Sequence, residues 1–410
     1  MTTPELAAAE RPARLEQAAF YSLLAFAVAV QFSIAAAGIL LTVTGALWLA
    51  LVVTGRERVD VPWMFWPLAA YGGATLVAAL FSIDPAISIL KSKQLILFLI
   101  VPIVYRLARG ERTLTVVDVI ITVGAINALF GIVQFALLRY DHIALRPQGT
   151  LMYMTYSGVL MLVACTAAAR LLFRNEDRVW AALIMPALVV ALAVTLSRNA
   201  WVGACAGIGL LLLIRDFRLV ALVPVAAAIF IAIAPATVTD RFYASFQLTD
   251  RADDSVTADA SIQSNRDRIA MIRSGVRMVR DHPWLGLGPD MVQQVYPQYR
   301  HPAAVHQQAI HLHNVPLQIA AERGLPALGL WLWFVLTLVR DFARRRTRTA
   351  WPSLPTAGLA VVVAMLAAGM FEYNFHDSEF LMLFLVLVTL PFAADRAAAL
   401  EPGAAPRPTA

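Results

Sequence analysis

Four residues in this sequence have side chains suited to holding and transferring an anionic group. Arg198 stands in a three-residue link between two apolar runs, and Arg266 and Arg268 open a later periodic segment. His313 directly precedes a helical pattern. A guanidinium group is a planar fork of donors that matches phosphate, and a histidine titrates close enough to neutrality to act as a base. The four residues predict a site in which arginines hold a phosphate group beside one imidazole.

Arg198 is the most isolated of these signals. It begins a helix, where a positive charge opposes the helix dipole, and it lies at the edge of an apolar span, where an unpaired charge is unfavourable. Its side chain either extends to lipid headgroups or binds an anionic substrate. No pair of carboxylates and no DxD motif accompanies it to hold a metal-bound diphosphate. We therefore expect a lipid diphosphate, or a similar anionic leaving group, held by arginines instead of magnesium.

Histidines are concentrated before the helical pattern, so a metal site has to be considered. His311 and His313 are two residues apart, which places them on opposite sides of a strand or spread apart on a helix. No HExxH motif or carboxylate triad accompanies them. We expect no metal and no cofactor. His311 is instead a candidate for substrate binding, as is Asn314, which is also a suitable helix cap. The histidines of this segment are His301, His306, His311 and His313.

The elements that must position these residues are membrane helices. The chain has 410 residues, of which 60% are apolar, whereas soluble domains are about 45–50% apolar. The apolar runs are long enough to cross a hydrocarbon core of about 30 Å as helices. We predict an all-α polytopic membrane protein with about twelve transmembrane helices and one large outer loop that contains amphipathic helices. The predicted spans are 17–34, 36–54, 62–82, 94–108, 114–138, 151–173, 179–196, 200–214, 219–235, 325–340, 357–374 and 379–394.

Basic residues are distributed unevenly between the two sets of loops. One set includes both chain ends and the Arg-rich segment 340–348, and it holds most of the arginines. By the positive-inside rule this set is cytoplasmic, so both termini are cytoplasmic and the long loop lies outside. The net charge of +6 then reflects topology. It does not predict nucleic-acid binding, because no long basic run with interleaved aromatics is present.

The chain divides into four segments. Residues 1–236 hold nine predicted spans, 237–324 form the outer loop with the catalytic elements, and 325–396 hold three more spans. Residues 397–410 are rich in Ala and Pro, and we expect a disordered cytoplasmic tail. Five further polar residues are expected on the outer face. Arg146 is retained as a substrate-binding candidate. The others are weaker, since any outer loop needs polar residues: His142, Glu372, His376 and Asp377.

Three local patterns predict packing or turns. Residues 268–280 have the period of an amphipathic helix with Ile269, Ile272, Val276 and Val279 on one face, which either lies in the membrane interface or caps the bundle. The glycine-rich corner 282–289 either holds phosphate on its amides or is a structural turn. Gly203 and Gly207 permit close helix packing.

Three sequence pieces resemble the O-antigen ligase and O-antigen polymerase superfamily of bacterial envelope glycosyltransferases. Their order and spacing on one large loop make the resemblance specific over about residues 190–340, while the earlier spans agree only in hydropathy. The pieces are Ser197-Arg198-Asn199-Ala200-Trp201, then Arg268 followed by Asp281-His282-Pro283-Trp284-Leu285-Gly286-Leu287-Gly288, and then His313-Asn314-x-x-Leu317 with Gly324 after it.

The resemblance implies an inverting, metal-independent transfer of O-antigen polysaccharide from undecaprenyl diphosphate to lipid A-core during lipopolysaccharide assembly. The enzyme would lie in the bacterial inner membrane with a periplasmic site. Arg198 and Arg268, with Arg266 as the alternative to Arg268, would hold the diphosphate, and His313 would activate or orient the acceptor hydroxyl. An O-antigen polymerase with the same donor is the alternative within the family. The third activity in the superfamily is that of a protein O-oligosaccharyltransferase, which usually has a larger C-terminal extension than this sequence.

The alternative from another class is a lipid flippase or transporter. Such proteins place polar residues near the membrane midplane, often between repeats. Here the polar residues gather at the outer edge, and we find no repeat.

Overall fold

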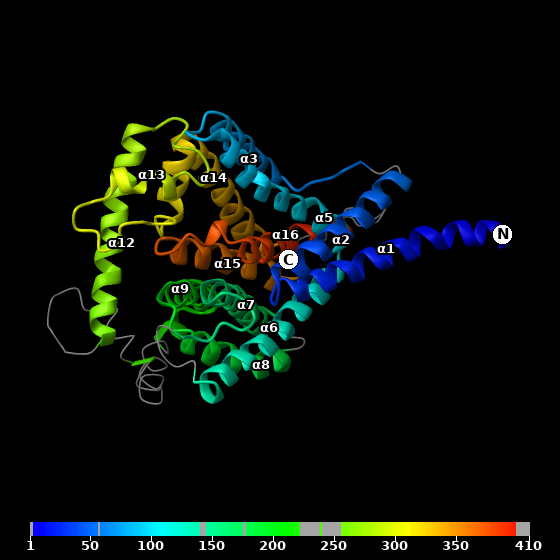
Figure 1. The fold of residues 1–410 in the computed structure, drawn as a ribbon. Helices are drawn as coiled ribbons and strands as arrows, with labels where there is room; N and C mark the ends of the chain where they lie inside the picture. Colours follow the sequence, from blue (N-terminus) through cyan, green and yellow to red (C-terminus); the bar gives the residue numbers. More distant parts are fainter. Residues whose placement is uncertain are drawn as a thin grey trace.

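The protein is described by a computed structural model that covers residues 3–55, 58–139, 145–174, 178–221, 238–239 and 256–398. These residues form helices and the turns that join them (Figure 1). The α-helices are α1 (Thr3–Ala29), α2 (Ile34–Thr54), α3 (Phe65–Leu80), α4 (Pro85–Lys91), α5 (Ile100–Leu107), α6 (Arg112–Leu137), α7 (Tyr153–Phe173), α8 (Arg178–Val194), α9 (Arg198–Arg215), α12 (Val256–Asp281), α13 (Val292–Tyr299), α14 (Val315–Arg345), α15 (Ser353–Gly369) and α16 (Ser378–Ala398). Three 3-10 helices accompany them: η1 (Ser92–Leu99), η2 (Phe217–Ala221) and η3 (Asn374–His376).

The all-α polytopic class predicted from the apolar runs is confirmed. In the described part of the chain, seven segments are long and apolar enough to cross a membrane: 34–54, 85–107, 112–137, 153–173, 198–215, 315–345 and 378–396. The helices α3, α8 and α15 are apolar but shorter. Each predicted span coincides with one of these segments or helices or with α1, except 219–235, most of which lies outside the described residues. The count of twelve stays a prediction.

The glycines of α9 permit the close packing expected from their spacing. A Cβ atom on Gly203 would lie 2.8 Å from the carbonyl oxygen of Ala364, and one on Gly207 would lie 2.8 Å from that of Ala360. Both carbonyls belong to α15, so the two helix backbones approach more closely than larger residues would allow. This contact sets the position of α9, and with it the position of Arg198 at the start of that helix.

We expect Gly207→Leu to destabilise the protein. The added side chain would force α9 away from α15, and overpacking of this kind costs about 1–3 kcal/mol. Thermal unfolding of the purified protein in detergent measures the effect. Gly209→Leu is the matched control, because a Cβ at Gly209 meets nothing within 4 Å. Equal melting temperatures for the two variants would contradict the packing role of Gly207.

Helix α12 crosses one end of the bundle, at the left in Figure 1 and on the side away from the N-terminus. The amphipathic helix predicted over 268–280 is confirmed as part of this longer helix. Met271 and Met278 are buried in a satellite core with residues of α13 and α14. Most of the predicted apolar face points elsewhere, since Ile269 and Ile272 are 50% and 42% exposed, although Val279 packs against the satellite core. The helix therefore caps the bundle with a face that the sequence pattern did not single out.

The glycine-rich corner after α12 is a structural turn. The Gly288 amide donates a hydrogen bond to the Glu322 carbonyl oxygen at 2.8 Å. Gly286 has φ of 66°, and a Cβ on it would lie 2.5 Å from the Arg323 amide nitrogen. Gly324, with φ of 80°, interrupts α14 at the same point. Close approach and positive φ both require glycine here.

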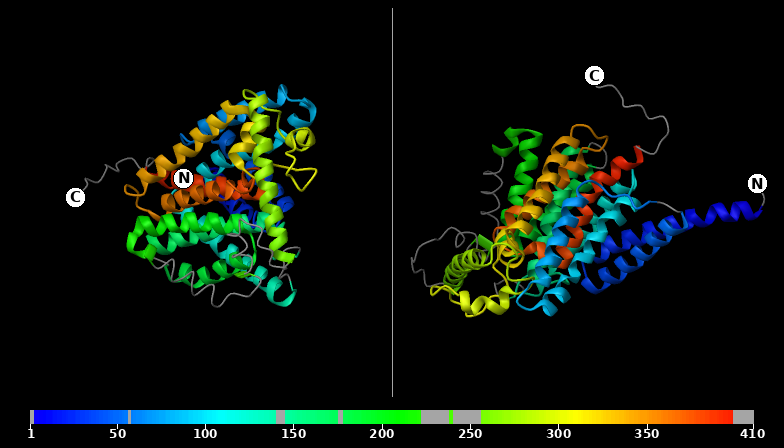
Figure 2. Two further views of the ribbon diagram at one scale, coloured as in Figure 1. Left: turned by 90° about the vertical axis from the view of Figure 1, so that its left-hand side faces the viewer. Right: turned by 90° about the horizontal axis from the view of Figure 1, so that it is seen from above.

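The residues of each set of loops lie together, and the two sets are at opposite ends of the bundle. At one end, Glu16 lies 2.8 Å from both Arg109 and Arg112, and Asp60 lies 3.7 Å from Arg396. These residues belong to the set that the basic-residue count assigned to one side. The ends of the helices that carry the catalytic candidates lie opposite them (Figure 2). Which end faces the cytoplasm stays a prediction.

Candidate functional site

Two adjoining cavities lie beneath α12. The smaller has a volume of about 370 Å³, and the larger has about 890 Å³. They share lining residues from α7, α9, α12 and the loop before α14, including Asn199, Met271, His306 and His313. The cavities therefore adjoin at the end of the bundle that α12 covers.

Three arginines line the smaller cavity. They are Arg146 from the loop before α7, Arg198 at the start of α9 and Arg268 of α12. Nη2 of Arg198 is buried without a hydrogen-bond partner. Among the described residues, no carboxylate forms an ion pair with Arg198 or Arg268. This wall of the cavity therefore has a local excess of positive charge, suited to an anionic ligand.

Burial acts on both arginines that lie outside the spans, and the charge of Arg268 also acts on Arg146. Burial lowers the pKa of Arg146; the Tyr153 side chain opposes this effect, and the positive charge of Arg268 adds to it. Burial also lowers the pKa of Arg268, against the opposing effects of the Glu372 and Tyr153 side chains. Arg146 lies over the ring of Tyr153, 4.0 Å from its centroid, which holds the guanidinium in place. An anion bound between the arginines would relieve this repulsion.

His313 and Glu372 form a hydrogen-bonded pair at the boundary of the two cavities. Nδ1 of His313 lies 3.0 Å from Oε2 of Glu372, and the other carboxylate oxygen accepts the Tyr373 amide at 3.0 Å. Burial raises the pKa of Glu372, but the hydrogen bond and charge of His313 and the charge of His311 outweigh it and lower that pKa to about 2. An ionised Glu372 requires a proton on Nδ1. Nε2 of His313 is then left as an acceptor.

His311 lies beside His313, contrary to the expectation that the two would diverge. Their ring centroids are 4.2 Å apart in an edge-to-face arrangement. The reason is the backbone of His313, whose φ of 50° is left-handed and breaks the alternation of a regular strand. Burial lowers the pKa of His311 to about 4, against the raising effect of Glu372. His311 is therefore neutral at neutral pH, and it lines the larger cavity.

Sequence reasoning missed Asp267, which ties α12 to the histidine-rich loop. Its buried carboxylate accepts the Val305 amide at 2.6 Å and the His306 amide at 3.1 Å, and it contacts Nδ1 of His306. Its position along the helix could have indicated that it is buried. Asp267 stands four residues before Met271 and eleven before Met278, and it therefore shares the buried face.

The remaining candidates are divided between the cavities and their surroundings. Arg266 is exposed and does not line the cavity that Arg268 lines. Asn314 caps α14, accepting the Leu317 amide at 2.9 Å, and does not line either cavity. His376 and Asp377 line the larger cavity, while His142 lies outside the described residues.

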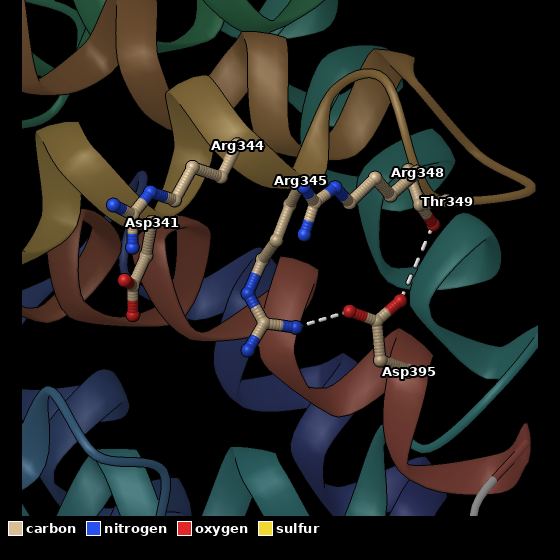
Figure 3. Close-up of a pocket in the computed structure, with 6 residues that line it drawn as sticks. All are labelled: Asp341, Arg344, Arg345, Arg348, Thr349 and Asp395. Carbon is tan, nitrogen blue, oxygen red and sulfur yellow. Dashed lines mark hydrogen bonds and ion pairs between the residues drawn. The ribbon is translucent and has the colours of Figure 1, made fainter.

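A separate basic cavity of about 460 Å³ lies where α14 ends (Figure 3). It is lined by arginines, but Asp395 of α16 pairs with Arg345 and accepts a hydrogen bond from Thr349 at 3.2 Å. None of the histidines that the structure describes lines it. Helix α14 separates it from His313 by on the order of 45 Å. This cavity lacks an imidazole, and its arginines lie beside carboxylates, so we assign the candidate site to the opposite end.

Comparison with known proteins agrees with this assignment. Residues 182–332 match the family model described as O-antigen ligase, so this segment is similar to that family. The segment contains Arg198, Arg268 and His313, but Arg146 and Glu372 lie outside it. A search of curated proteins finds no significant match to the chain.

Proposed function

We propose that this chain, with its O-antigen ligase family segment, transfers O-antigen polysaccharide from undecaprenyl diphosphate to lipid A-core. The acceptor, the donor and the surrounding lipids would be its partners. The observation that supports this function most directly is the group of three arginines beside His313. One of these arginines, Arg198, has a buried guanidinium nitrogen without a partner. An anionic leaving group at this position would satisfy that nitrogen.

In the proposed mechanism, Arg146, Arg198 and Arg268 hold the diphosphate of the donor. Nε2 of His313 accepts the proton of the acceptor hydroxyl while the hydroxyl oxygen attacks the anomeric carbon of the donor. The bond between that carbon and the diphosphate oxygen breaks, and its electron pair leaves with undecaprenyl diphosphate. Attack from the side opposite the leaving group inverts the anomeric configuration. Glu372 stabilises the imidazolium that forms.

The lipopolysaccharide gel profile of a deletion strain tests this function. A ligase defect is expected to leave core without O-antigen and to accumulate lipid-linked polymer. Core capped with a single repeat would instead identify an O-antigen polymerase. A flippase would move the donor across vesicles without consuming its diphosphate linkage, whereas the proposed transfer releases undecaprenyl diphosphate.

We expect a chelator such as EDTA not to lower the transfer rate. In the proposed mechanism the arginines bind the diphosphate without a metal. Removal of divalent cations therefore does not weaken that binding. Purified protein, lipid-linked donor and acceptor are assayed with and without chelator. A loss of transfer that added magnesium restores would contradict diphosphate binding by arginines alone.

We further propose that the protein lies in the bacterial inner membrane with both termini cytoplasmic. The segments 1–236 and 325–396 would span the membrane, and 237–324 would form the periplasmic loop. Arg273→Cys, at an exposed position of α12, is expected to react with a membrane-impermeant thiol reagent in cells with a permeabilised outer membrane. Arg344→Cys, at the other end, is expected to stay unlabelled. The opposite labelling pattern would reverse the proposed topology.

A further inference from the structure

The group formed by His311, His313 and Glu372 has a second chemical capacity. Each side chain offers one ligand atom, and the three atoms lie within 4.8 Å of one another. Nδ1 of His313 is 3.0 Å from one carboxylate oxygen, and Nε2 of His311 is 3.6 Å from the other. The carboxylate thus stands between two imidazoles that face it from the same loop.

This donor set is one that zinc prefers. Two histidines and one glutamate occur together in zinc sites that keep a fourth position open. All three residues here line the larger cavity, which leaves room for a water molecule at such a position. Zinc–ligand distances of about 2.0–2.2 Å require the donor atoms to lie roughly 3.4 Å apart. The present spacing needs only small side-chain rotations to reach that geometry.

The surroundings do not tie up His311. Within the described residues, its Nδ1 has no hydrogen-bond partner, and its Nε2 faces Glu372 beyond hydrogen-bond distance. The carboxylate is buried and already held by the Tyr373 amide. A bound cation would take both imidazoles and the carboxylate without breaking that backbone contact.

We propose that His311, His313 and Glu372 form a zinc-binding site and that zinc bound there inhibits the enzyme. Zinc binds the Nδ1 lone pair of neutral His313, so the remaining ring proton lies on Nε2. That nitrogen then has no lone pair for the proton of an acceptor hydroxyl. The binding is independent of the proposed glycan transfer, while the inhibition rests on it.

Zinc binding is measured with full-length protein in detergent, after metal removal, by competition with a chromophoric zinc chelator. We expect one site per chain and at least about a 10-fold weaker affinity in His311→Ala and in Glu372→Gln. His306→Ala is the matched control, since His306 is exposed on the same loop and pairs with Asp267. Equal weakening in the control, or no binding by the unmodified protein, would overturn the site.

Two further measurements separate folding from binding and binding from inhibition. Cobalt(II) added to the unmodified protein is expected to give the visible absorption bands of a four-coordinate site. This measurement needs no variant, so it does not depend on whether a variant folds. Zinc is expected to inhibit transfer, and His311→Ala to require at least about 10-fold more zinc, each protein being compared with its own metal-free rate. Binding without inhibition would overturn the inhibitory role. Activity that depends on zinc would overturn both that role and the metal-independent mechanism. Absence of transfer both with and without zinc would refute the proposed function, and with it the inhibition, but not the binding of zinc.

Discussion

Arg198→Ala and Arg268→Ala are each expected to lower glycan transfer by at least about 100-fold. Loss of one preorganised donor to a developing negative charge commonly costs about 10²–10³ in rate. Both guanidinium groups line the same cavity, and neither has a carboxylate partner in the described residues. Release of undecaprenyl diphosphate from a purified lipid-linked donor measures the effect. Insertion of each variant in the membrane and its melting temperature show that the protein is folded.

The matched control is Arg266→Ala, on the same helix two residues before Arg268. Arg266 is exposed and does not line the cavity, so we expect its replacement to cost far less than that of Arg268. Arg198→Lys keeps the charge but loses the two-pronged geometry, and an intermediate rate is expected. If Arg266→Ala were as damaging as Arg268→Ala, the cavity would not be the diphosphate site.

His313→Ala is expected to reduce transfer by about 10²–10⁴-fold, the usual contribution of a general base. Glu372→Gln is expected to reduce it by about 10–100-fold, because an amide orients the imidazole less firmly and does not stabilise its charged form. The same release assay, run on folded variants, measures both effects. The donor should still bind to each variant, since the arginines are intact.

The control for this pair is His301→Ala, another histidine of the same loop that lines neither cavity. We expect it to keep most of its activity. The pH–rate profile adds a second readout, because loss of the base should remove any dependence of the rate on its protonation. Full transfer by His313→Ala would remove this histidine from the mechanism.

The fold was predictable where one physical quantity dominates. Apolar runs of the length of a bilayer specify spanning helices almost regardless of neighbours, and only the stretch 219–235 falls mostly outside the described residues. The assignment of polar residues to one face of the membrane then predicted which side chains could lie close together. Arg198, Arg268 and His313 were assigned to one face, and they do line one cavity.

The rest depended on contacts that local patterns do not encode. Glu372 follows His313 by 59 residues, and nothing in its own neighbourhood marks it as the partner. Asp267 likewise binds amides 38 and 39 residues later. The expectation that His311 and His313 diverge was wrong because period arguments assume a regular backbone. A single left-handed residue, His313 itself, turned the two rings to the same side.

The carboxylate that holds the imidazole belongs to a part of the chain that the family segment does not include. Residues 182–332 therefore do not contain every side chain of the candidate site. A chimera that received this stretch alone would inherit Arg198, Arg268 and His313. If His313 is the base, as proposed, it would be oriented in the same way only if the recipient supplied a carboxylate equivalent to Glu372.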